Sequence, residues 1–503
     1  MGVFGPREPV VRTVCGKVRG APDDRGILVF RGIPFAASTA GANRFQPPRP
    51  PAAWEGVRMA EAAGPIAPQN APELGLSRLP PASEDCLNLN VFTPSADRGR
   101  RPVLVYLHAG AFVSGTGSGA TQDGSQLARD EDVVVVTVNY RLGVLGFPPF
   151  RPGGQGPSNL GLLDQVAALQ WVRANIARFG GDPRNVTLFG YSAGGWSIVA
   201  LMTAPQAAGL FHKAAPQSGS EFTASPPAEQ AALARAFCAF AGVAETDVAA
   251  LQALPLDRLL AAQQALLESR QNAAGRQIEE GIVFGPRLDG VVLAEDPFRM
   301  ALAGRIAPLP MLIGTTADEL GYTPFRAAIG WLDAMHAREA ALRSLAAAYG
   351  EDRAQRIWQA YTHYFPGHDD AQIAGHIRSD RYYRLPAIRV AEAQRAPTWM
   401  YQFTLPAPSQ AAGGVSTHAT DLPFWFGTMA ASPLQPFLFG RDPSRAELAL
   451  SRRMRRDLAG FARTGRCDWA GYGTRNRATK LYGENDEIAF DPQASLRRAW
   501  PAT

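Results

Sequence analysis

The chain has few cysteines for its length, and they lie far apart. Among 503 residues there are four, Cys15, Cys86, Cys238 and Cys467, and no two of them form a C-x-x-C pair. This spacing indicates neither a metal cluster nor a dense disulfide framework. A chain of this length needs neither of them, because it can bury a large apolar core.

Long apolar runs are also missing. No stretch of 18 consecutive apolar residues occurs, so we expect no membrane span. The N-terminal segment MGVFGPREPVVRTVCGKVRG has Arg7 and Glu8 where the apolar region of a secretory signal would begin. We therefore expect no signal peptide and a cytoplasmic protein.

Lysine is scarce, with only Lys17, Lys213 and Lys480, so the mild net charge of +5 comes almost entirely from arginine. Arginine together with abundant Ala, Gly and Pro indicates a GC-rich, bacterial genome. No basic run is interleaved with aromatic residues, which argues against nucleic-acid binding. The remaining composition, 46% hydrophobic and 19% charged, is typical of an ordinary globular protein.

The order of apolar patterns predicts an α/β fold. Continuous β-branched runs within residues 101–112 and 132–143 are typical of strands buried on both faces. Residues 158–181 then have helical spacing, with Ser158 or Asn159 as N-cap and Gly180 as stop. A strand ending in NVTLFGYS and a helix AGGWSIVALMTAP follow. This order predicts a mostly parallel central sheet with helices on both faces.

Outside that core, the sequence predicts smaller features of a single domain over residues 1–503. Short strands within residues 10–35 predict a small N-terminal antiparallel sheet. Two Ala- and Leu-rich segments, about 225–275 and about 325–395, have helical composition. We interpret them as helical insertions that form a lid.

The stretch TLFGYSAGGWS places Ser192 between Gly190 and Gly194. A G-x-S-x-G match arises by chance roughly 0.3 times in a chain of this length and composition. The surrounding sequence therefore decides whether this match marks a nucleophile. Here a strand precedes the serine and a helix follows it, as in the sharp turn that exposes a nucleophilic serine. The glycines remove side chains that would collide where the chain reverses. We predict that Ser192 is a nucleophile.

A serine hydroxyl needs a base to remove its proton. Of the seven histidines, His418 alone follows a flexible run, GGVST, just past a predicted core strand, where this architecture places its base. Asp318 and Glu319 follow another strand end, and the residues alone leave both open as the acid that orients the imidazole. The chain order of serine, acid and histidine is that of α/β-hydrolases.

The segment HAGAF, residues 108–112, ends a buried strand with small residues. Their backbone N–H groups can approach an oxygen that becomes negatively charged during acyl transfer. Gly110 and Ala111 are the candidate donors, with Ala193 after the serine as a third.

Further motifs occur in one order along the chain: FRGIPFA, RFQPP, SEDCLNLNVFTP, HAGAF, NYRLGVLGF, GLLDQVAALQWVRANIARFGGDP, GYSAGG, QSGS, GTTADE and H-x-x-DLPFWFG. Together they resemble the type B carboxylesterase family, which contains bacterial p-nitrobenzyl-type esterases and the cholinesterases. The resemblance runs from about residue 10 to about residue 490. It implies an α/β-hydrolase fold, a catalytic triad of Ser192, His418 and Glu319, and an oxyanion hole from Gly110, Ala111 and Ala193.

The resemblance implies roles for further residues. It places structural salt bridges between Arg44 and Glu84 and between Arg141 and Asp164. Ser218 matches a position behind the triad, and Tyr191 is a further candidate for the surroundings of the triad or the substrate gorge. Tyr322 matches an aromatic wall of the substrate gorge, and weaker candidates for that wall are Phe112, Trp196 and Phe222.

Three departures from the family pattern stand out. Ala109 occupies a slot that is usually glycine, which would strain the turn if the backbone there has a positive φ. Tyr191 replaces the usual glutamate before the serine, and this loss of negative charge argues against a cationic choline ester. The usual partner of Cys86 is Ala67 here, so we expect a free Cys86 thiol.

These features predict a serine carboxylesterase that acts on small, mostly uncharged esters, without a cofactor or metal and most simply as a monomer. Two alternatives stay open. The same chemistry could serve a specialised polyester, carbamate, amide, lactone or toxin ester. A non-catalytic scaffold on the same fold is the other, although all three triad residues are present.

Overall fold

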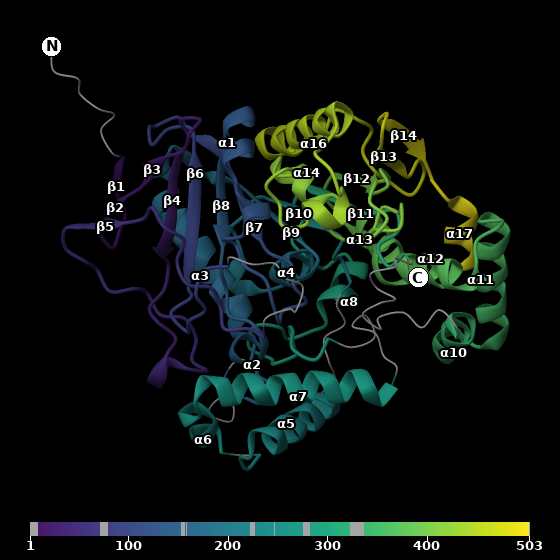
Figure 1. Cartoon of the computed structure of the whole chain (residues 1–503), viewed down its shortest axis with the longest axis horizontal. Coiled ribbons are helices and arrows are strands. Elements are labelled where there is room, and N and C mark those ends of the chain that lie inside the picture. Colours follow the sequence, from purple (N-terminus) through teal and green to yellow (C-terminus); the bar gives the residue numbers. More distant parts are fainter. Residues whose placement is uncertain are drawn as a thin grey trace.

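Eleven strands form one large sheet at the centre of the protein (Figure 1). The computed structural model describes residues 9–70, 79–151, 156, 158–221, 227–245, 247–274, 282–321 and 336–501. Within them the strand order is β14-β13-β12-β11-β10-β9-β7-β8-β6-β4-β3. The strands are β3 (Ala21–Pro22), β4 (Leu28–Pro34), β6 (Asn88–Thr93), β7 (Arg101–Leu107), β8 (Val134–Val138), β9 (Gly181–Tyr191), β10 (Lys213–Gln217), β11 (Met311–Thr316), β12 (Thr398–Phe403), β13 (Ala478–Tyr482) and β14 (Glu487–Phe490).

The middle of this sheet is parallel. Strands β8, β7, β9, β10, β11, β12 and β13 run in one direction, while β6, β4 and β3 at one edge and β14 at the other pair antiparallel. The predicted mostly parallel sheet of an α/β-hydrolase is thus confirmed. Because the carboxyl ends of parallel strands meet at one edge, the loops after β7, β9, β11 and β12 lie near one another.

A separate small sheet contains β1 (Val10–Arg12), β2 (Lys17–Arg19) and β5 (Val57–Met59). It differs in direction from the prediction, because β1 and β2 pair antiparallel but β2 and β5 pair parallel. The long connection between β2 and β5 allows the return that a parallel pair requires. Strand β4, which also lies within the N-terminal segment, joins the large sheet instead.

Helices cover both faces of the large sheet, as predicted. Alternation along β7 sends Val103, Val105 and Leu107 to one face, and Leu104 and Tyr106 to the other. The first face packs against α3 (Leu160–Asn175), α4 (Ala193–Leu201), α8 (Pro297–Leu302) and α13 (Leu385–Ala393). The second packs against α1 (Ser125–Glu131), α14 (Leu422–Phe426) and α16 (Arg445–Thr464).

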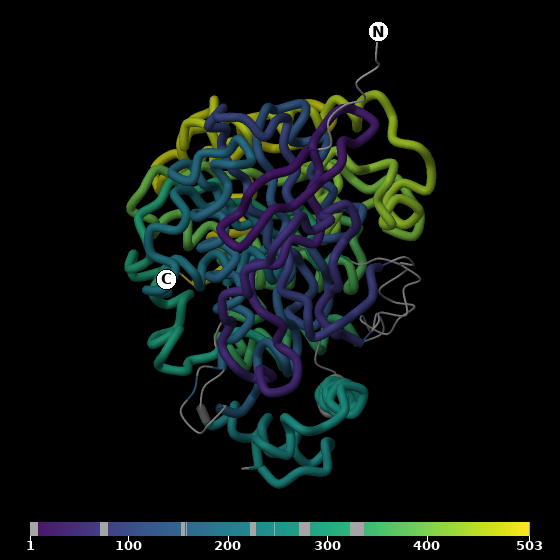
Figure 2. Tube along the Cα trace, turned by 90° about the vertical axis from the view of Figure 1, so that its left-hand side faces the viewer, coloured from purple at the N-terminus to yellow at the C-terminus, as the bar shows by residue number. Residues whose placement is uncertain are grey.

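Both segments predicted as helical insertions contain helices. Helices α5 (Pro227–Ala241), α6 (Val248–Ala253) and α7 (Leu256–Ala274) lie together at one end of the molecule in two perpendicular views (Figures 1 and 2). The second segment contains α10 (Ala337–Tyr349), α11 (Glu351–Tyr364), α12 (Asp370–Ser379) and a π-helical turn, Asp380–Arg384, before α13. Further short helices are α2 (Gly143–Gly146), α15 (Gln435–Leu438) and α17 (Ala494–Ala499).

The ends of the predicted helix over residues 158–181 show one difference. Helix α3 begins directly after Asn159, but the Asn159 side chain caps no helix amide. Its Nδ2 donates to the Arg287 carbonyl and its Oδ1 accepts from the Arg287 N–H, each at 2.8 Å. A tertiary partner therefore replaces the local one. Gly180, with φ of 81°, ends the short 3₁₀ turn that follows α3.

Among the described residues, no helix combines the length and apolar character needed to cross a membrane.

Candidate active site

Ser192 lies in a sharp turn between β9 and α4. Its backbone has φ of 53° and ψ of −116°, a strained conformation for a residue other than glycine. The turn is held by a hydrogen bond from the Ser192 N–H to the Gln217 carbonyl at 2.9 Å. A Cβ on Gly194 would lie 2.0 Å from the Leu107 carbonyl oxygen, so only glycine allows α4 to approach β7 this closely.

Glu319 and His418 meet at the same edge of the sheet, from the loops after β11 and β12. His418 Nδ1 lies 2.5 Å from Glu319 Oε2. The other carboxylate oxygen accepts the Thr316 N–H at 2.8 Å, and Glu319 is fully buried. This arrangement fixes the ring of His418 and suits a carboxylate that accepts the Nδ1 proton.

Asp318, the other candidate acid, faces elsewhere. Its Oδ2 accepts the Ser416 N–H at 3.3 Å, and its Oδ1 lies 3.1 Å from Nδ1 of His376 on α12. Asp318 thus braces the loop that leads to His418. The choice between the two acids, which the residues alone left open, is decided in favour of Glu319 as the partner of the His418 ring.

The serine turn and the His418 loop are in contact through Tyr191. The Tyr191 and His418 rings lie 5.0 Å apart, and the Tyr191 hydroxyl accepts the Ala419 N–H at 2.8 Å. In the part of the chain that the structure describes, no hydrogen bond joins the Ser192 hydroxyl to the His418 ring. Such bonds often tighten only when substrate is present.

The loop after β7 presents the candidate oxyanion donors. Gly110, Ala111 and Phe112 have φ of 124°, 51° and 62°, whereas Ala109 has no positive φ, so the strain considered for Ala109 does not arise. Among the described residues, the amide N–H groups of Gly110, Ala111 and Ala193 form no hydrogen bond. Three free backbone donors are what an oxyanion needs.

The buried side chain of His108 contacts the backbone of this loop. It is 1% exposed, its Nδ1 lies 2.8 Å from the Ala109 carbonyl oxygen, and its ring stacks on Tyr140 at 4.2 Å. Burial lowers the pKa of His108 to about 4, although its hydrogen bond to Ala109 raises it. A ring so buried and so weakly basic is unsuited to accept the serine proton.

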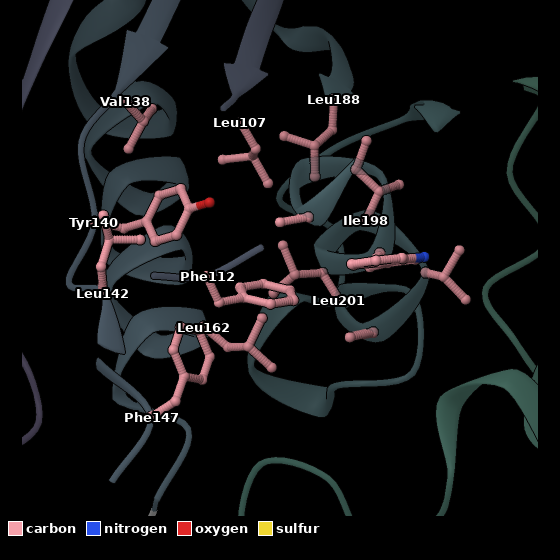
Figure 3. Close-up of a cluster of buried hydrophobic side chains, with 14 of the residues drawn as sticks. Leu107, Phe112, Val138, Tyr140, Leu142, Phe147, Leu162, Leu188, Ile198 and Leu201 are labelled. Atoms are coloured by element: carbon pink, nitrogen blue, oxygen red, sulfur yellow. The ribbon is translucent and has the colours of Figure 1, made fainter. Parts of the chain in front are cut away.

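Phe112 does not line a gorge, contrary to the expectation. It is fully buried, 4.9 Å from the Phe147 ring, and packs among apolar side chains of the core (Figure 3). Trp196 is also buried, at 8% exposed. Tyr322 and Phe222, the other gorge candidates, lie outside the described residues.

Ser218 lies directly beneath the serine turn. Its N–H donates to the Gly314 carbonyl at 2.9 Å, and its neighbour Gly219 approaches the Ser192 carbonyl so closely that a Cβ would lie 2.1 Å from it. Ser218 itself is buried and has φ of 48°. It therefore lies next to a residue that packs against the serine turn, and its role behind the triad candidates stays a prediction.

Sequence reasoning missed two residues next to His418. Tyr383, in the π-helical turn, has its ring 5.2 Å from the His418 ring. No sequence pattern predicts a π-helical turn, which often marks a functional site. Asp421 lies three residues after His418, and its position before the apolar run LPFWF resembles an ordinary helix N-cap.

Asp421 is fully buried, and its Oδ2 accepts the indole N–H of Trp425 at 3.0 Å. Burial raises the pKa of Asp421 to about 6, and the nearby charge of Glu319 acts in the same direction. The hydrogen bond from Trp425, the Tyr191 hydroxyl and the charge of His418 act against that rise. A second buried carboxyl group, with a raised pKa of its own, thus follows His418 by three residues.

Both implied ion pairs are present. Arg44 Nη2 lies 2.5 Å from Glu84 Oε2, and Arg141 Nη2 lies 2.7 Å from Asp164 Oδ1. The second pair is almost completely buried, with side chains 2% and 0% exposed. The predicted free thiol of Cys86 is confirmed, and burial raises its pKa.

Comparisons with known proteins give one consistent result. The model of the carboxylesterase family matches residues 7–502. The chain is 38% identical to a para-nitrobenzyl esterase of Bacillus subtilis (strain 168), over 97% of this chain and 98% of that protein. It is 35% identical to a phenmedipham hydrolase of Pseudarthrobacter oxydans, over 86% of each. A solved PNB esterase structure superposes with a TM-score of 0.86 at 35% identity, covering 98% of this chain and 100% of that one.

Proposed function

Because this chain belongs to the carboxylesterase family and is a carboxylic ester hydrolase, we propose that Ser192, His418 and Glu319 form its catalytic triad. Ser192 attacks the ester carbonyl carbon, and His418 accepts the hydroxyl proton at Nε2 and later transfers it to the leaving alcohol. Glu319 holds the ring and stabilises its charged form. The observation that carries this proposal is the 2.5 Å contact between His418 and the buried Glu319, beside the strained Ser192 turn.

The amides of Gly110, Ala111 and Ala193 are the proposed oxyanion hole. Their N–H groups are without hydrogen bonds among the described residues, and α4 directs the positive end of its dipole toward the same place. Donors that are already oriented stabilise the negative charge of the tetrahedral intermediate without rearrangement. Water then attacks the acyl-enzyme, with His418 as the base, and releases the acid.

The proposed substrates are small esters without a positive charge. Tyr191 is buried and neutral at the position before the nucleophile, because burial and the charges of Asp421 and Glu319 hold its pKa well above the usual value. A site without an anion there has nothing at this position to attract a quaternary ammonium group. The helical insertions at about 225–275 and about 325–395 are the proposed lid, and the contact of Tyr383 with His418 supports this for the second.

A panel of p-nitrophenyl and choline esters tests this proposal, with Ser192→Ala as the blank. We expect turnover of neutral esters by the unchanged enzyme and a loss of about 10⁴-fold or more in kcat for Ser192→Ala. Substantial hydrolysis by that variant would refute the proposed nucleophile. Faster hydrolysis of choline esters than of neutral esters of equal size would refute the proposed substrate class. Amides and carbamates of matched size decide whether other bonds are cleaved.

A further inference from the structure

Tyr191 makes an unusual connection between the two loops of the proposed triad. It is the residue immediately before Ser192, and its hydroxyl accepts the N–H of Ala419, the residue immediately after His418, at 2.8 Å. The two aromatic rings also touch, with centroids 5.0 Å apart and planes inclined by 53°. A single side chain therefore spans from the nucleophile's strand to the peptide group of the base.

Both ends of this connection are strained. Ser192 has φ of 53° and Ala419 has φ of 72°, in a region that residues with a Cβ adopt only when their surroundings hold them there. On the Ser192 side, the Gln217 carbonyl holds the backbone. On the Ala419 side, the Tyr191 hydroxyl is the acceptor of the amide, so the peptide between His418 and Ala419 depends on it.

The hydroxyl of Tyr191 also needs an acceptor for its own proton, since its pKa is held high and it stays protonated. Two buried oxygen atoms that have no hydrogen-bond partner among the described residues, Asp421 Oδ1 and Ser218 Oγ, are the candidate acceptors. Asp421 is the charged one of the two, and Tyr191 lowers the pKa of its carboxyl group against the larger effect of burial. Both groups are fully buried, so water does not compete for these bonds.

We propose that Tyr191 is a positioning residue for His418. Its hydroxyl group accepts a hydrogen bond from the Ala419 amide and donates one toward the Asp421 carboxylate. The imidazole is thereby fixed on two sides, by Glu319 at Nδ1 and by Tyr191 through the following peptide. The hydroxyl accepts the Ala419 backbone N–H, and among the described residues it has no hydrogen bond to the Ser192 or His418 side chain. This inference rests on the proposed triad.

The alternative is that Tyr191 merely fills space beneath the site. Its ring packs in the second core cluster with Phe189 and Tyr106, and a phenylalanine would pack there equally well. The two roles therefore differ in what the oxygen atom alone contributes. Removal of that oxygen separates them.

Tyr191→Phe is the test, with Tyr482→Phe as the matched control. Tyr482 is also fully buried and also donates to a carboxylate, Asp457, at 2.7 Å, but it lies on β13. We expect Tyr191→Phe to lower kcat by about 10- to 100-fold and to change KM by less than about 3-fold, since a displaced base slows proton transfer more than binding. We expect Tyr482→Phe to leave kcat within about 2-fold.

The pH profile of kcat/KM distinguishes the two roles of Tyr191, because the profile would not change if its hydroxyl only filled space. The titratable groups around His418 are Glu319, Asp421, Tyr191 and Tyr383. Without the Tyr191 hydroxyl, Asp421 keeps its proton to higher pH, so less negative charge supports the imidazolium. The acid limb of the profile should therefore move to lower pH in Tyr191→Phe. Asp421→Asn should move the acid limb in the same direction. The variant that combines both substitutions should show no further shift beyond that of Asp421→Asn.

The outcomes separate the two proposals. If Ser192→Ala is inactive while Tyr191→Phe has an unchanged kcat and pH profile in a folded protein, the positioning role is wrong and the triad stands. If Ser192→Ala remains active, the triad itself is wrong. Should Tyr191→Phe lose its fold, as judged by circular dichroism, the milder Asp421→Asn variant decides the positioning role through the same acid limb.

Discussion

At the scale of single residues, the site depends on where each carboxyl group lies. Glu319 accepts a backbone N–H and contacts His418, Asp318 braces the neighbouring loop, and Asp421 is fully buried and accepts the Trp425 indole N–H. The three acids thus have different roles. The role of each acid is therefore decided by the groups that its carboxylate contacts.

His418 gives the first prediction at this scale. His418→Ala should lose activity to nearly the same degree as Ser192→Ala, because the members of a triad act as a unit. Steady-state kinetics on a p-nitrophenyl ester checks this. His212→Ala is the control, since the His212 ring accepts the Val186 N–H at its Nδ1, away from the serine turn. Near-native rates in His418→Ala, combined with loss in His212→Ala, would show that the wrong base was chosen.

Glu221 gives a prediction on stability. It follows the QSGS segment, and burial raises its pKa to about 7, although Arg389 and Arg381 act against that rise. The folded state therefore binds this proton more tightly than the unfolded state, in which the pKa is about 4.3. Stability contributed by the protonated carboxyl is present below about pH 4 and is lost as pH rises to about 7.

Glu221→Gln removes this dependence. Relative to the unchanged protein, we expect the variant to gain about 2 kcal/mol in the free energy of unfolding at pH 8 and little at pH 4. Urea denaturation at the two pH values measures the difference. An equal effect of the substitution at both would show that Glu221 ionises normally in the folded protein.

At the scale of the elements, the site exists because α4 begins very close to the end of β7. The N-terminal turn of this helix contains Gly194 and Gly195, and neither position has room for a Cβ. The same approach places the Ala193 amide beside the loop with Gly110 and Ala111. Close packing of one helix end on one strand therefore brings together the proposed nucleophile and the proposed oxyanion donors.

Gly194→Ala tests this packing, with Gly460→Ala as the matched control. A Cβ at Gly194 would lie 2.0 Å from the Leu107 oxygen, whereas one at Gly460, inside α16, meets nothing within 4 Å. We expect Gly194→Ala to destabilise the fold by about 3 kcal/mol and to abolish activity. Gly460→Ala should be stabilised by about 0.5–1 kcal/mol. Thermal unfolding of both variants checks this, and equal melting temperatures would contradict it.

Much of this element structure could be predicted from the sequence, for physical reasons. Local patterns predict several elements: β-branched runs predict β7 and β8, and periodic apolar residues predict α3 and α16. The parallel pairing of β5 in the small sheet, the use of Asn159 by Arg287 and the π-helical turn with Tyr383 depend on tertiary partners that a local pattern does not contain. Phe112 is a weaker candidate for the gorge wall from the resemblance alone, and its burial in the core depends on packing that a local pattern does not contain.

At the scale of the whole molecule, buried ion pairs tie distant segments together. The Arg44 guanidinium binds Glu84 and also donates to the carbonyl oxygens of Gln252 and Leu254, at 2.8 and 2.5 Å. It therefore connects the N-terminal part of the chain to the insertion with α5, α6 and α7. The order of serine, acid and histidine along the sequence predicts the candidate site, but this attachment of the insertion follows only from the fold.

Arg44→Met should loosen that insertion. Removing one partner of a buried pair leaves the Glu84 carboxylate uncompensated, at a cost of about 3 kcal/mol. We expect faster amide hydrogen exchange over residues 247–274, measured by mass spectrometry. Arg305→Met is the control, because Arg305 pairs with Glu295 on the surface, where both side chains are about half exposed. Unchanged exchange over 247–274 in Arg44→Met would show that other contacts hold the insertion.

The most direct test of the whole account is covalent labelling with a fluorophosphonate, followed by peptide mass spectrometry. The reagent transfers its phosphonyl group to the activated serine and releases fluoride. We predict one adduct per chain, on Ser192, formed with loss of esterase activity and slowed by about 10³-fold or more in His418→Ala. An adduct on a different residue, or full inactivation with Ser192 unmodified, would contradict the account.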